Sequence, residues 1–94
     1  MKRFPIELAK SRNRANGRHF FSPDTMRFFN SRTSTYCKGD DEAGVLYFVT
    51  SEQGDSLPRK YTARAMRPNG VVDDIGKFQA FDSARQAWRA IEEL

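Results

Sequence analysis

Apolar and polar residues alternate along several short stretches in the middle of the chain, which is the pattern of strands in a sheet. Val45–Ser51 is apolar on both of its faces, so we expect this strand to lie at the centre of the sheet. Arg59–Arg67 has one apolar and one polar face, which predicts a half-exposed strand. Further strands are predicted at Arg32–Cys37, which is rich in Thr and Tyr, and at Lys77–Phe81. The intervening Val71–Gly76 is ambiguous.

Two segments carry helix signals. The clearer one is the C-terminus, where Ser83 and Gln86 fit a capping box. Apolar positions with helical spacing follow it: Ala84, Ala87, Trp88 and Ile91. Trp88 is expected to hold this helix against the sheet. The Ser-Pro-Asp sequence at residues 22–24 is a helix-start signal, which predicts a short helix near residues 23–29.

The N-terminal segment, residues 1–19, has little periodicity. Apolar residues alternate within Arg3–Ala9, so this stretch can add a short strand at an edge of the sheet, where Pro5 is tolerated. Lys10–His19 is rich in basic and small polar residues, which indicates a mobile arm or a long loop. We therefore divide the chain into a basic arm or edge segment, residues 1–19, and one domain, residues 20–94.

Together these elements predict an α+β domain. Three or four antiparallel strands follow one another along the chain, and the C-terminal helix packs on one face of their sheet. A chain of 94 residues has room for one domain only, and its eight Phe, three Tyr and one Trp supply an aromatic-rich core.

Charge is unevenly distributed and changes this picture. Residues 1–38 carry nine Lys or Arg against two Asp or Glu, whereas residues 39–94 carry seven against ten. The net charge of +4 is therefore the result of a strongly basic front half and a mildly acidic back half. A basic segment beside such a body indicates an anionic partner, either a nucleic acid or an acidic protein surface. The alternative is that arginine only solvates a small aromatic-rich surface.

Basic residues also alternate with aromatic rings, a combination that can hold phosphates and stack bases. The candidate binding residues are Arg12, Arg14, Arg18, Phe20, Arg27, Arg32, Lys60 and Arg64. Lys60 and Arg64 are expected on the polar face of one strand. The aromatic-glycine signature of an RNA-recognition sheet is missing from the sequence.

Other chemistry has little support in the sequence. One cysteine, Cys37, and one histidine, His19, form neither an internal disulfide nor a zinc site. The acidic run Asp40–Glu42 lacks the alternate spacing of a calcium loop. No nucleophile elbow or phosphate loop is present, so we expect no catalytic residue, no metal and no cofactor. The longest apolar run, Val45–Val49, is too short to cross a membrane, and no secretory signal is visible, so a cytoplasmic location is expected.

Four sequence runs carry a family resemblance. They are Phe20–Arg32, Tyr47–Glu52, Lys60–Arg64 and Phe78–Ser83. Together they resemble short proteins of unknown function that bacteriophages and other mobile elements carry, over about residues 20–91. The resemblance implies an accessory protein directed at the host or its defences and brings no catalytic residues. Many phage proteins of this size and build are anti-CRISPR inhibitors, which extends the expectation by analogy.

Two functions follow from these observations. The first is a small non-enzymatic binding protein of phage or mobile-element type, which inhibits a host defence complex such as CRISPR-Cas by docking on it. Its partner would be a larger host protein or ribonucleoprotein complex in the host cytoplasm. The alternative is a module that binds nucleic acid directly through its basic N-terminal half.

Overall fold

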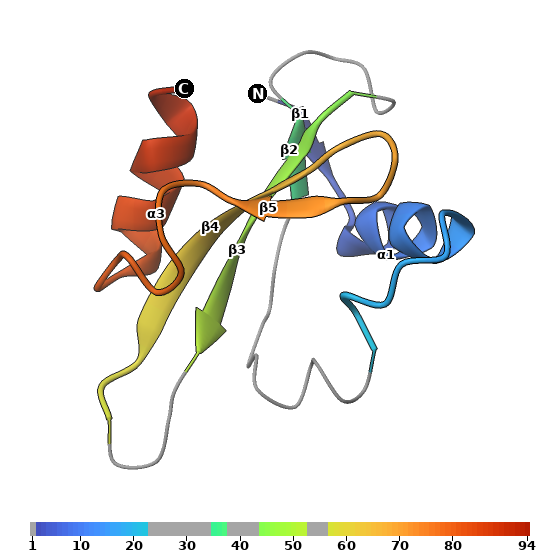
Figure 1. Cartoon of the computed structure of the whole chain (residues 1–94). Helices are drawn as coiled ribbons and strands as arrows, with labels where there is room; N and C mark the ends of the chain where they lie inside the picture. The colour runs from blue at the N-terminus through green and yellow to red at the C-terminus, as the bar shows by residue number, and fades with distance from the viewer. Residues whose placement is uncertain (1, 23–34, 38–43, 53–56) are drawn as a thin grey trace.

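The computed structural model describes residues 2–22, 35–37, 44–52 and 57–94. Within these residues, five strands form one antiparallel sheet in which chain order is also spatial order. The strands are β1 (Lys2–Phe4), β2 (Thr35–Cys37), β3 (Leu46–Glu52), β4 (Lys60–Met66) and β5 (Val72–Asp74). Helix α1 (Ile6–Ala15) follows β1, and helix α3 (Ala84–Glu92) lies on the other side of the sheet (Figure 1). The expected α+β class, with a C-terminal helix packed on one face of an antiparallel sheet, is confirmed.

Strands β3 and β4 form the centre of the sheet and pair along their full length, from Leu46 opposite Met66 to Glu52 opposite Lys60. All residues of β3 except Tyr47 are buried, which confirms the expected central strand. The half-exposed strand expected at residues 59–67 is wrong, because three consecutive residues of β4, 62 to 64, are buried. Consecutive strand residues point to opposite faces, so both faces of β4 are covered.

Each face of the sheet has its own hydrophobic core. On the α1 side the buried residues are Phe4, Ala9, Leu46, Phe48 and Met66. On the α3 side they are Val49, Ala63, Ala87 and Ile91. The two cores follow from the period-2 alternation of β3 and β4, which sends Phe48 to one face and Val49 to the other.

The N-terminal segment differs from the expectation. An edge strand does form, but it ends at Phe4, and Pro5 then stands at the N-cap of α1. The loop expected over Lys10–His19 is wrong for most of its length, because α1 continues to Ala15. This helix buries only a small residue, Ala9, and a polar one, Asn13, so it has no apolar stripe for a sequence pattern to reveal.

Two further expectations concern strands and a helix outside this segment. The last strand is not Lys77–Phe81 but β5, and Phe81 contributes only an isolated bridge to Tyr61. Gly76 and Gln79 have positive φ values of 79° and 57°, and this left-handed backbone interrupts an extended strand. The short helix expected near residues 23–29 lies outside the described residues.

Helix α3 begins as the capping signal predicted. The side chain of Ser83 accepts a hydrogen bond from the Gln86 backbone N–H at 3.2 Å, and the Gln86 side chain accepts one from the backbone N–H of Asp82. Ala87 and Ile91 are buried against the sheet, whereas Ala84 is exposed. Neither this helix nor any other in the described ranges has the length and hydropathy needed to cross a membrane.

Replacing Trp88 with alanine is expected to lower the free energy of unfolding by about 2 kcal/mol. The half-buried ring packs on the α3-side core, so its loss costs less than that of a fully buried tryptophan. For a domain of this size the change corresponds to a fall in melting temperature of roughly 8–16 °C. Thermal unfolding followed by circular dichroism measures it, and an unchanged melting temperature would contradict the packing of α3 on the sheet.

Candidate functional site

A pocket of about 310 Å³ opens where helix α1 ends and the chain turns back toward the sheet. Its lining residues are Lys10, Asn13, Arg14, Arg18, His19, Phe21 and Ser22. Three of these side chains are cations, one is an imidazole and one is an aromatic ring. No carboxylate belongs to the described lining, so the pocket is suited to an anion rather than to a metal ion.

The cations of the pocket are available to a ligand. Among the described residues, Arg14 and Arg18 are exposed and have no ion-pair partner. Lys10 lies 4.0 Å from Glu7, in a solvent-exposed pair one helical turn apart. Exposed pairs of this kind contribute little free energy, so the pair does not withhold Lys10 from a ligand. The planar guanidinium groups can each donate two parallel hydrogen bonds to a phosphate.

The end of α1 has the geometry that places Arg18 at this pocket. The Gly17 N–H donates to the Arg14 carbonyl at 3.0 Å, and the Arg18 N–H donates to the Asn13 carbonyl at 2.9 Å. These two bonds define a Schellman motif, which requires a left-handed residue just beyond the helix. Gly17 supplies it, with a φ of +69°. The resulting reversal returns residues 18–22 past the helix end.

Asn13 ties this reversed segment to the sheet. Its side chain is buried, with 3 % exposure, and uses both ends of its amide. The Nδ2 atom donates to the Gly70 carbonyl at 3.0 Å, and the Oδ1 atom accepts from the Phe20 N–H at 3.1 Å. Gly70 belongs to the turn between β4 and β5, so one side chain joins the helix, the segment after it and the sheet.

Gly70 allows this turn to approach the helix closely. A Cβ atom at this position would lie 3.0 Å from the Cβ of Asn16, and the residue has a φ of +82°. Any other residue would be strained in this conformation and would also press on the helix end. The floor of the pocket is therefore fixed by two contacts between segments that are far apart in sequence.

Aromatic packing fixes the other wall. Phe21 lines the pocket, and its ring centroid lies 5.0 Å from that of Phe20 in an edge-on arrangement. Both rings also contact Phe48, which is fully buried, at centroid distances of 5.9 Å for Phe20 and 5.7 Å for Phe21. Edge-on and tilted pairs of this kind are favourable, so the wall is held rigidly.

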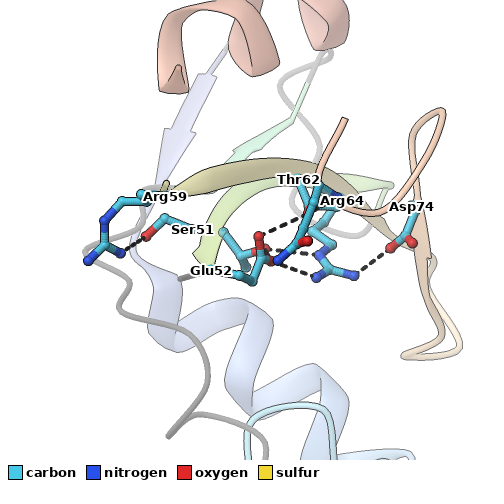
Figure 2. A network of polar contacts seen from close by, with 8 residues as sticks. Ser51, Glu52, Arg59, Thr62, Arg64 and Asp74 are labelled. Atoms are coloured by element: carbon cyan, nitrogen blue, oxygen red, sulfur yellow. Dashed lines mark hydrogen bonds and ion pairs between the residues drawn. The ribbon is translucent and has the colours of Figure 1, made fainter. Parts of the chain in front are cut away.

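Behind this wall lies a buried polar network around Arg64 (Figure 2). The guanidinium group is 5.2 Å from the ring centroid of Phe20 and 5.4 Å from that of Phe78. It donates to the Glu52 carboxylate at 3.0 Å and pairs with Asp74. Its Nε donates to the Thr50 hydroxyl, also at 3.0 Å.

Glu52, the centre of this network, is as well satisfied as Arg64. Its two carboxylate oxygens also accept hydrogen bonds from the hydroxyls of Thr50, at 2.7 Å, and Thr62, at 3.1 Å. The Thr62 hydroxyl in turn accepts from the Gln79 N–H at 2.9 Å. A buried charge surrounded in this way is stable inside a protein, whereas removal of one partner is costly.

The structure separates the residues predicted to bind a ligand. Arg14 and Arg18 meet at the pocket, whereas Phe20 lies in the aromatic wall. Arg64 is only 6 % exposed and is committed to internal partners, so its expected role as an exposed phosphate contact is wrong. Other members of the predicted set are placed as follows: Arg12 donates to the Gly44 carbonyl at 2.6 Å, Lys60 pairs with Asp82, and Arg27 and Arg32 lie outside the described residues.

Several residues of the site were not among those predicted. Lys10 and Arg14 are four residues apart, a spacing that places both on one face of a helix, but the helix itself was not expected. Phe21 carried a signal, because it stands among basic residues beside Phe20. Asn13 carried none, since its partner Gly70 is 57 residues away. In the described ranges, no three His, Cys, Asp or Glu side chains are grouped so as to hold a metal ion.

Fold and site together define a small α+β protein with a five-stranded antiparallel sheet between two helices and, in its described part, a basic pocket at the end of the first helix. The chain belongs to a family of unknown function, DUF7447, whose model matches residues 5–92. The match includes α1 and the residues of the pocket, which the resemblance over residues 20–91 left partly outside. No curated protein and no solved structure matches the chain.

Proposed function

We propose that this protein is a non-enzymatic module that binds nucleic acid by its phosphate groups. The observation that carries the proposal is the basic pocket, in which three cations and an imidazole gather with no carboxylate in its described lining. Helix α1 does not itself attract an anion here, because its C-terminal end carries a partial negative charge. The side chains of Lys10, Arg14 and Arg18 must therefore supply the attraction.

Two features favour a nucleic acid over an acidic protein surface. Arginine is the side chain best matched to the geometry of a phosphate, and both exposed arginines of the pocket lack partners among the described residues. An aromatic ring, Phe21, stands beside these cations, which is the combination found where proteins hold phosphates and bases together. Docking on a host defence complex such as CRISPR-Cas stays a prediction from the sequence, since the family match does not bear on it.

Replacing Arg14 and Arg18 together with glutamine is expected to weaken binding to an oligonucleotide by about 10- to 100-fold near physiological salt. Each lost phosphate contact releases fewer counterions, so the slope of log affinity against log salt should fall by roughly 1.4–1.8. Fluorescence anisotropy of a labelled oligonucleotide, repeated at several salt concentrations, measures both quantities.

A matched control removes the same charge elsewhere. Arg85 and Arg89 are exposed on helix α3, on the opposite side of the sheet from the pocket. Their replacement with glutamine should leave the salt slope nearly unchanged and weaken binding only through the lower net charge. Equal losses in the two double variants would mean that binding depends on overall charge alone, and the pocket would then have no special role.

A further inference from the structure

We infer that the pocket takes one unstacked nucleotide, so that the protein prefers single-stranded nucleic acid to a duplex; this rests on the proposed function. The pocket combines a wall that can stack a base, Phe21, with cations that can hold the adjoining phosphates, Arg14 and Arg18. Its volume of about 310 Å³ is at the lower end of the range for small-molecule sites. A site of this size suits one nucleotide rather than a helical segment.

The Phe21 ring is prepared for stacking before a ligand arrives. Phe20 and Phe48 hold it from two directions, at centroid distances of 5.0 Å and 5.7 Å. The ring is only half-buried, so part of its surface remains open to the pocket. Because its position is already fixed, stacking a base on it costs little additional side-chain entropy. A base inside a duplex is stacked on its neighbours and cannot reach this surface without unpairing.

The same pocket offers little means of reading a base. Asn13 has the side chain best suited to recognise the edge of a base, and both atoms of its amide are already engaged by Gly70 and Phe20. Recognition therefore depends on stacking and on charge, neither of which distinguishes strongly between bases. We expect binding that is selective for single strands and tolerant of sequence.

The test compares an oligothymidylate with a duplex of equal length, both labelled, on the full chain. The Phe21→Leu variant keeps an apolar side chain against Phe48 but removes the stacking surface. It should weaken binding to the single strand by about 5- to 100-fold and leave the salt slope and the weaker duplex binding unchanged. The Phe21→Tyr variant keeps a ring of similar size and should bind as the unmodified chain does. As a control, the Phe78→Leu variant alters an exposed ring outside the pocket lining and should also bind normally.

The outcomes separate this inference from the proposal on which it rests. Equal affinity of the unmodified chain for single strand and duplex would overturn the preference, while leaving phosphate binding in place. Equal losses in the Leu and Tyr variants of Phe21 would show that the ring supports the fold and does not stack a base. Absence of binding to either oligonucleotide at low salt would overturn the proposed function itself.

Discussion

Replacing Arg64 with methionine is expected to lower the free energy of unfolding by about 3–5 kcal/mol. The substitution keeps an apolar side chain of similar length between Phe20 and Phe78 but removes the positive charge that neutralises Glu52. Glu52 would then be a buried carboxylate held only by the hydroxyls of Thr50 and Thr62. Urea unfolding followed by circular dichroism measures the change.

Two further variants make this result specific. Arg67→Met removes an arginine from the same hairpin whose pair with Asp73 is exposed, and it should cost at most about 1 kcal/mol. Combining Glu52→Gln with Arg64→Met should recover part of the loss, because no unpaired carboxylate then remains at position 52. Equal effects of the Arg64 and Arg67 variants would contradict a buried network.

Replacing Asn13 with alanine is expected to cost about 2–4 kcal/mol, the second largest effect on stability. The change leaves the Phe20 N–H and the Gly70 carbonyl without their hydrogen-bond partner, and Gly70 is buried. It also releases the segment that carries Arg18 and Phe21 from the sheet. Nucleic-acid affinity should therefore fall along with stability, even though Asn13 makes no contact of its own with a phosphate. Chemical unfolding and anisotropy measure the two effects on the same samples.

Asn16 provides the matched control at the same helix end. Its side chain donates one exposed hydrogen bond to the Arg12 carbonyl, so Asn16→Ala should change stability by no more than about 0.5 kcal/mol. Similar losses at positions 13 and 16 would show that the helix end is merely frayed by substitution. A loss confined to position 13 supports its role in joining the helix to the β4–β5 turn.

The predictable part of the fold is the part whose signal is local. Strands β3 and β4 alternate at period 2, and helix α3 has both a cap at Ser83 and apolar residues at helical spacing. Helix α1 could not be predicted in this way, because it packs through Ala9 and Asn13 rather than through large apolar residues. Its contact with the sheet, between Asn13 and Gly70, depends on tertiary structure that no local pattern encodes.

The candidate site divides in the same manner. Charge alone indicated Arg14 and Arg18, but it could not show that Gly17 reverses the chain and brings them to one pocket. Arg64 was misplaced for a related reason. Its position on the polar face of β4 predicts exposure, yet the register sets Asp74 directly opposite it, and Glu52 reaches it from β3. Acidic partners on two neighbouring strands allow an arginine to be buried where the pattern of one strand predicts water.

The most direct test of the account is to map the contact surface with backbone amide resonances during titration with an oligothymidylate. We predict that the largest shifts occur at the pocket residues, with Arg14, Arg18 and Phe21 foremost. Residues on the outer face of α3, such as Arg85 and Arg89, should shift little. Shifts concentrated on α3, or spread evenly over the basic residues of the chain, would contradict a nucleic-acid site at the end of helix α1.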